Sequence, residues 1–196
     1  RDFMRQHIMS LLEMLMRVFQ NPKCTDHVRS EVLQTMGEVT HILQEEKHAK
    51  EIRAYHDIVP IALAWLHEYL AAGKTSTHSG VETAYRAFGF FSELLRNPMP
   101  LIVEHVKLLA NEMVDIVLHT GFPTAIRHRA NTCITELNEH KHKRVEKLGL
   151  VDKFLETALR CASEPVVTEG KSVSAPSRLT IEIIGSLCES FPLEYI

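Results

Sequence analysis

The residues in this sequence most able to support binding chemistry are glutamates at helical spacing. Within each predicted helix their spacings are three, seven or eleven positions, and such spacings return side chains to one side of an α-helix. The set consists of Glu31, Glu38, Glu45, Glu82, Glu93, Glu136, Glu139, Glu182 and Glu189. Together they could form an anionic surface for a lysine- and arginine-rich protein segment. The alternative is an ordinary solvated helix face, because a single exposed ion pair contributes only about 0–1 kcal/mol.

Histidine is the other abundant residue type with chemical potential, at 12 residues. Its spacing does not indicate a metal site, because the sequence has no H-E-x-x-H motif and no cysteine near a histidine at zinc-finger spacing. No arrangement typical of a catalytic centre is present either. We therefore expect no catalytic residue, no metal and no cofactor, and a protein that is not an enzyme.

A single basic cluster, His140-Lys141-His142-Lys143-Arg144, could contact nucleic acid or an acidic partner. No aromatic residues are interleaved with it to stack on bases. The net charge of −3 also lacks the basic excess of a duplex-binding domain. These observations favour a solvated turn between helices, and we expect no direct nucleic-acid binding.

Composition and cysteine usage indicate a folded protein that works inside the cell. The 196 residues are 45% hydrophobic and 24% charged, which is ordinary for a folded chain. No run of about 18 apolar residues could span a membrane. The four cysteines are far apart without a C-x-x-C pair, which is typical of reduced thiols in the cytosol or nucleus. The chain begins at Arg1 within a helical pattern, so we interpret it as part of a longer protein.

Helix-length segments alternate with residues that end or begin helices, such as Asn21-Pro22, Gly73, Asn97-Pro98 and Gly121. The pattern predicts eight helices in four pairs. The predicted helices are 3–20 with 25–46, 57–72 with 79–96, 101–120 with 123–139, and 147–162 with 176–191.

A small residue recurs inside the second helix of each pair, at Gly37, Gly89, Thr135 and Gly185, with separations of 52, 46 and 50 residues. A glycine inside a helix costs about 1 kcal/mol relative to alanine. Its recurrence predicts that a neighbouring helix or the next pair approaches closely at that point. The pattern predicts an all-α fold, an α-α superhelix of about four HEAT-type hairpins forming one array over residues 1–196. The hairpins are 3–46, 57–96, 101–139 and 147–191.

The stretch from Glu51 to about Glu164 is more specific. It contains Ile58-Val59-Pro60, the segment Ala87 to Leu95, Pro100 to Val106, Ala125 to Arg129, and Lys141 to Val151 followed by Phe154-Leu155. In these segments the chain resembles the importin beta (karyopherin beta) superfamily of nuclear transport receptors. The resemblance is to the amino-terminal half of the receptors in the branch that carries histones and ribosomal proteins. One difference is the long segment from Ser163 to Ala175, which is rich in Val, Ser and Thr where several importins have an acidic loop.

The resemblance implies a segment of a nuclear import receptor that binds basic cargo, such as histone or ribosomal-protein segments, on an acidic concave face. It also implies action in the cytoplasm and nucleus, with Ran and Phe-Gly nucleoporins as partners of the full-length receptor. Trp65 could serve as a hydrophobic contact for the Phe-Gly repeats of these nucleoporins, although core packing is the favoured interpretation. The alternative function is a HEAT-repeat scaffold subunit that organises an enzyme or a chromosome-associated complex.

Overall fold

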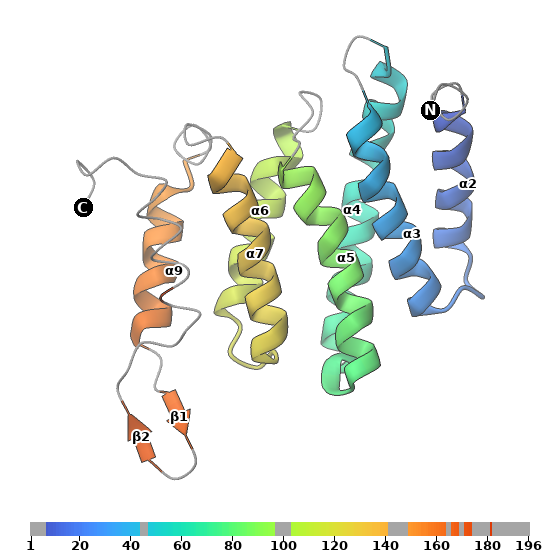
Figure 1. Ribbon diagram of the computed structural model, residues 1–196. Coiled ribbons are helices and arrows are strands. Elements are labelled where there is room, and N and C mark those ends of the chain that lie inside the picture. Colours follow the sequence, from blue (N-terminus) through green and yellow to red (C-terminus); the bar gives the residue numbers. More distant parts are fainter. Residues whose placement is uncertain are drawn as a thin grey trace. The chain divides into compact units, whose positions relative to one another are not determined.

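The computed structural model describes residues 7–43, 47–96, 103–140, 149–163, 166–168, 171–173 and 181 (Figure 1). The chain divides into two compact units, Arg1–Leu109 and Ala110–Ile196, which are described in turn. The elements in the first unit are α2 (Ile8–Gln20), α3 (Asp26–Val39), the 3-10 turn η1 (Thr40–Ile42), α4 (Ala49–Ala71), the 3-10 turn η2 (Lys74–Ser76) and α5 (His78–Arg96). Helix α6 (Val103–Leu118) crosses the boundary, and the second unit continues with α7 (Thr124–His140), α9 (Val151–Ser163), β1 (Val166–Thr168) and β2 (Lys171–Val173).

Local sequence explains where the second helix of each pair in the first unit begins. Thr25 precedes α3, and its hydroxyl accepts a hydrogen bond from the backbone N–H of Val28 at 3.4 Å. Thr77 precedes α5 and accepts from the N–H of Gly80 at 3.1 Å. A threonine in this position satisfies one of the N–H groups that the first turn of a helix leaves without a partner. The two caps are 52 residues apart, the same separation as Gly37 and Gly89.

Helices α3 and α5 run parallel and pack directly on each other. The contacts advance in the same direction along the two segments, from Glu31 of α3 with Arg86 of α5 to His41, in η1 just after α3, with Glu93 of α5. Between these contacts, a Cβ added at Gly37 would lie 3.1 Å from the Cα of Phe90. A separation this short confirms the predicted close approach at Gly37. At Gly89 an added Cβ would meet no atom of the described residues within 4 Å, so the prediction is wrong there.

The first helices complete the core of this unit. Helix α2 packs on both α3 and α4. The largest fully buried side chains of the unit come from α2, α3, α4 and α5. They are Ile8, Leu12, Leu33, Met36, Ile52, Tyr55, Leu66, Phe88, Phe90, Phe91 and Leu94. Tyr55 donates a hydrogen bond to the carbonyl of Met36 at 2.7 Å, and its burial raises the pKa of the hydroxyl.

The second unit also packs helices against each other. Lys153 near the start of α9 pairs with Asp115 of α6 at 3.0 Å and donates to the carbonyl of Asn111 at 3.4 Å. Gly149, just before α9, has φ of 65°, a left-handed conformation that glycine adopts without strain. Beyond α9, β1 and β2 form an antiparallel hairpin in which Val166 pairs with Val173.

The all-α prediction is confirmed for the described residues apart from this hairpin, which lies in the segment predicted as a loop. β-branched residues at 166–168 favour the extended conformation. Helix α4 begins at Ala49 rather than at 57, and it contains Pro60 in its interior. Helix α3 ends at Val39 rather than at 46, because η1 follows and Leu43 is extended. The predicted last helix, 176–191, lies outside the described residues except for Ile181.

Within the described residues, none of the helices is both long enough and apolar enough to cross a membrane.

Candidate functional site: the α3–α5 surface

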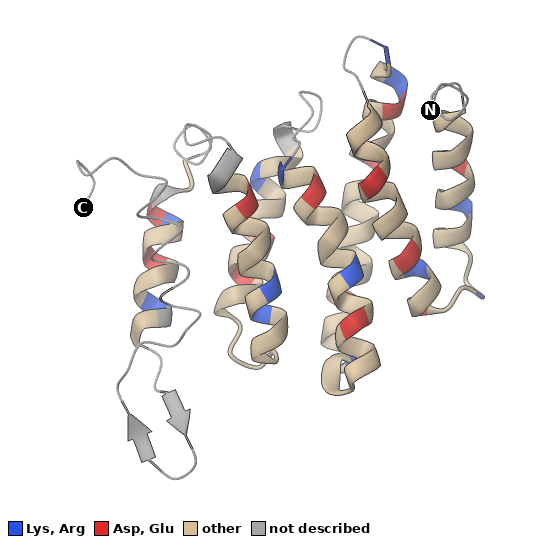
Figure 2. Ribbon diagram, in the orientation of Figure 1, with Lys and Arg blue, Asp and Glu red and all other residues tan. Residues whose placement is uncertain are grey.

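The parallel packing of α3 and α5 brings glutamates of two predicted pairs onto one two-helix face. We call this the α3–α5 surface and define it by Glu31, Glu38, Glu82, Arg86 and Glu93. Oε1 of Glu31 on α3 lies 2.7 Å from Nε of Arg86 on α5, so this ion pair joins the two helices. Glu38 is exposed and makes no ion pair with any described residue. Figure 2 shows that residues of both signs lie along α3 and α5, so the surface is acidic but not uniformly so.

Several of these carboxylates lie close to a histidine. Nε2 of His27 lies 3.9 Å from Glu31, and Nε2 of His78 lies 3.6 Å from Glu82. Both pairs are four residues apart on one helix and well exposed. Because imidazole carries a positive charge only when protonated, these histidines leave the surface anionic when they are neutral.

The side chain of Glu93 is more buried than those of Glu31 and Glu82, and it packs between the two helices. Its side chain is 21% exposed, compared with 48% for Glu31 and 55% for Glu82. Its Cγ would lie 3.5 Å from a Cβ placed on Gly37, so it fills space beside the close approach of the two helices. Oε1 accepts from Arg96 at 3.2 Å, while Nε2 of His41 lies 2.8 Å from Oε2.

That second oxygen, Oε2 of Glu93, is buried and accepts no hydrogen bond from the described residues, although the distance to His41 is short. The contact between Nε2 of His41 and this oxygen is an ion pair only when the imidazole is protonated. Glu93 is therefore a packing residue of the surface as much as a charged one.

The remaining predicted glutamates fall elsewhere. Glu136 is half-buried on α7 and Glu139 lies near the end of the same helix, both in the second unit. Glu45, Glu182 and Glu189 lie outside the described residues, as do residues 141–148, which hold most of the predicted basic cluster. The structure thus brings Glu31, Glu38, Glu82 and Glu93 together, within the first unit.

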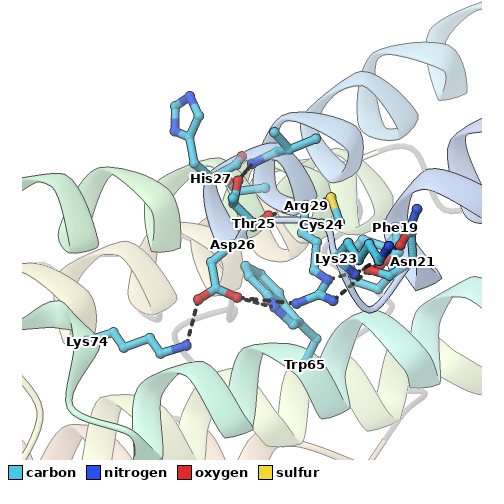
Figure 3. A network of polar contacts seen from close by, with 12 residues as sticks. Phe19, Asn21, Lys23, Cys24, Thr25, Asp26, His27, Arg29, Trp65 and Lys74 are labelled. Carbon is cyan, nitrogen blue, oxygen red and sulfur yellow. Dashed lines mark hydrogen bonds and ion pairs between the residues drawn. The ribbon is translucent and has the colours of Figure 1, made fainter.

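A polar network that the sequence did not reveal connects the two helical pairs of the first unit (Figure 3). Asp26 at the start of α3 accepts a hydrogen bond from Nε1 of Trp65 at 3.2 Å and pairs with Nζ of Lys74 at 2.6 Å. Arg29, one turn along α3, lies 3.5 Å from the same carboxylate. Trp65 itself is buried and packs edge-on against Phe19, with ring centroids 5.9 Å apart, which confirms its predicted role in the core.

Opposing effects set the pKa of Asp26. Desolvation by burial is the largest and would raise the pKa. The hydrogen bonds from Lys74 and Trp65, together with the positive charges of Lys74 and Arg29, outweigh it and hold the pKa below its ordinary value of 3.8. Asp26 is therefore ionised at neutral pH and ties the two helical pairs together.

The arginine of the Val28-Arg29 and Ile126-Arg127 dipeptides has the same structural role in both units. Nε of Arg29 donates to the carbonyl of Phe19 at 3.0 Å, and Nε of Arg127 donates to the carbonyl of Val117 at 2.6 Å. In each case the acceptor lies ten residues earlier, near the end of the first helix of the pair. Carbonyls there have no partner within their own helix, so each arginine satisfies one. An apolar residue followed by arginine near the start of the second helix is the sequence signal that could have predicted this contact, although the second pair has Val81-Glu82 at the corresponding point.

Among the residues that the structure describes, no group of three or more His, Cys, Asp or Glu side chains could hold a metal ion. Cys24 is half-buried and Cys133 is buried, and neither forms a disulfide.

No protein-family model, curated protein or solved structure matches the chain. The likeness to the importin beta superfamily therefore stays a prediction from the sequence.

Proposed function

We propose that the chain is a HEAT-type, protein-binding segment of a nuclear import receptor, and that its α3–α5 surface binds a lysine- and arginine-rich segment of a cargo protein. The observation that carries this proposal is the parallel packing of α3 on α5 with exposed glutamates on both helices. The repeated threonine caps and the 52-residue separation of Gly37 and Gly89 support a stack of repeated helical pairs. As part of a receptor, the segment would act without catalysis in the cytoplasm and nucleus. Ran and Phe-Gly nucleoporins would be partners of the full-length receptor.

The spacing of the carboxylates fits an extended ligand. Glu31 and Glu38 are seven residues apart, which is about 10 Å along a helix that rises 1.5 Å per residue. A peptide in the polyproline II conformation has about three residues per turn and rises about 3.1 Å per residue, so its side chains return to one side about every 9 Å. Basic side chains three residues apart in such a cargo segment would meet Glu31 and Glu38 in turn, and Glu82 on α5 would provide a further carboxylate.

The surface charge indicates weak, salt-sensitive binding. Arg86 compensates Glu31, so Glu38 and Glu82 contribute most of the uncompensated negative charge. Each exposed charge contributes at most about 1 kcal/mol, so affinity depends on several contacts acting together. Such binding should weaken steeply as salt screens the charges.

The test is fluorescence anisotropy of a labelled histone amino-terminal tail peptide with the full 196-residue chain, at several salt concentrations. The double variant Glu38→Gln/Glu82→Gln should weaken binding about 5- to 30-fold at low salt, corresponding to about 1–2 kcal/mol. Glu93 is left unchanged because it packs against Gly37. The matched control is Glu13→Gln/Glu68→Gln, which removes the same charge from exposed positions on α2 and α4.

Equal weakening by both double variants would show that only net charge matters and would contradict a site on α3 and α5. Failure of the unaltered chain to bind at low salt would contradict the cargo proposal. That outcome would favour the second candidate, a HEAT scaffold subunit, for which the mixed charges of α3 and α5 and discrete apolar patches would suffice.

A further inference from the structure

Helices α2 and α4 occupy equivalent places in the two helical pairs of the first unit. Aligning their last residues, Gln20 with Ala71, superimposes their buried positions. The buried residues of α2 are Ile8, Leu12, Leu15 and Phe19, and the positions of α4 that align with them are Val59, Leu63, Leu66 and Leu70, all buried as well. This apolar stripe packs within the core of the first unit in both helices.

Helix α4 buries a second stripe, whose equivalent on α2 is half-buried at Leu11 and exposed at Met14 and Val18. The second stripe consists of Ile58, Ala62, Trp65 and Tyr69, all buried. The first helical pair contacts it, because Trp65 packs against Phe19 of α2 and donates to Asp26 of α3. In the same alignment, the residues at these positions are His7, just before α2, and Leu11, Met14 and Val18 of α2. Met14 is 54% exposed and Val18 is 37% exposed, compared with 8% for Trp65.

A lysine just after each of the two helices also occupies an equivalent position in the alignment. Lys74, just after α4, reaches back to the first pair and forms the 2.6 Å ion pair with Asp26 (Figure 3). The residue that aligns with it is Lys23, just after α2, which is exposed and makes no ion pair with any described residue. In the first unit, then, a helical pair covers the apolar stripe of α4 and places a carboxylate against its terminal lysine. On α2, the equivalent side chains of Met14 and Val18 are exposed, and the equivalent lysine makes no ion pair with any described residue.

We propose that Leu11, Met14 and Val18 of α2, together with Lys23 just after the helix, form a docking surface for a helical hairpin built like α2–α3. The hairpin would place a large apolar side chain from the end of its first helix over Met14 and Val18. It would also place an acidic residue from the first turn of its second helix against Lys23. A hairpin rather than a single helix is required, because both α2 and α3 contribute to the contacts that cover α4. This surface is separate from the α3–α5 surface, so the inference does not depend on cargo binding.

The test supplies such a hairpin to the full chain. A second copy of the segment from His7 to Glu51, carrying Met14→Leu, is fused directly before Arg1, so that the copy stands before α2 at the same chain distance as α2 stands before α4. The measurement is the rate at which hydrogen peroxide oxidises Met14 of the original helix, followed by mass spectrometry in the fused and unfused chains. Docking should slow this oxidation about sevenfold, the ratio of the exposed fractions of Met14 (54%) and Trp65 (8%).

Charge reversal tests the register of docking. Lys23→Glu in the original helix should restore most of the fast oxidation in the fused chain, because it places two carboxylates together. Adding Asp26→Lys in the fused copy should bring the protection back. The control is Lys23→Glu in the unfused chain, which should change neither the oxidation rate nor the helical circular dichroism, since Lys23 is exposed.

Either of two results would overturn the proposal. One is an equal oxidation rate of Met14 in the fused and unfused chains, whether or not the added copy is helical, because a docking surface for such a hairpin must shield that side chain. The other is protection that Lys23→Glu leaves unchanged, because the predicted ion pair would then play no part in docking.

Discussion

The recurring glycines at 37 and 89 are equivalent in sequence but differ in their surroundings, and this difference gives a sharp prediction. Gly37 faces the backbone of α5, where an added Cβ would lie 3.1 Å from the Cα of Phe90. At Gly89, an added Cβ would meet no atom of the described residues within 4 Å. Replacing each glycine by alanine therefore makes the same chemical change in a tight and in an open environment.

The magnitudes follow from two effects. Alanine is better than glycine inside a helix by about 1 kcal/mol, and this gain applies at both positions. At Gly37 the new methyl group would be about 0.4 Å closer to Phe90 than the optimal separation of about 3.5 Å between carbon atoms. Because the atom in the way belongs to the backbone, relief requires a shift of α5, and overpacking of this kind costs about 1–3 kcal/mol. We expect Gly89→Ala to stabilise by about 1 kcal/mol, and Gly37→Ala to destabilise by about 1 kcal/mol.

The assay is urea unfolding followed by the fluorescence of Trp65, the only tryptophan, which lies in the first unit and reports its unfolding. The two variants should differ by about 2 kcal/mol in the free energy of unfolding, with an unchanged dependence on urea concentration. If Gly37→Ala stabilises the protein as much as Gly89→Ala does, the close approach of α3 and α5 at Gly37 is refuted.

Three further predictions concern polar contacts. Asp26 takes up a proton at lower pH in the folded state than in the unfolded state, so its contribution is complete above about pH 4 and is lost as pH falls further; acid unfolding curves of Asp26→Asn should lack this component. Arg127→Leu leaves the carbonyl of Val117 without its 2.6 Å donor and should lower the free energy of unfolding by about 1.5–3 kcal/mol in urea melts followed by circular dichroism. Tyr55→Phe removes only the hydroxyl that donates to the carbonyl of Met36, and thermal unfolding should show a loss of about 1–2 kcal/mol; an unchanged melting temperature would contradict a hydrogen bond there.

The helices can be predicted with good boundaries where local chemistry marks their ends. Thr25 and Thr77 cap helices, and Gly73 follows α4 in the left-handed conformation that glycine tolerates. The predicted start of α4 is eight residues too late. Proline is commonest in the first turn of a helix, so Pro60 suggests that a helix starts nearby. The structure instead places it inside a 23-residue helix.

The candidate site is predicted less completely than the helices. Helical spacing correctly places Glu31 and Glu38 on an exposed part of α3, and Glu82 on an exposed part of α5. It cannot show that Arg86 compensates Glu31, or that Glu93 packs beside Gly37. These contacts join residues that are more than fifty positions apart in the chain, and no local pattern reports them.

By itself, the sequence determined the helical character, most helix ends and the apolar stripe of each helix, because these depend on propensities, caps and periodicity over a few turns. Only the tertiary structure decided that α3 and α5 lie parallel, that Gly37 is crowded while Gly89 is open, and that Lys74 has a carboxylate partner while Lys23 has none among the described residues. The physical reason is that burial and pairing depend on which distant side chains arrive at a position. Two positions with the same local sequence pattern can therefore have different neighbours and different energies.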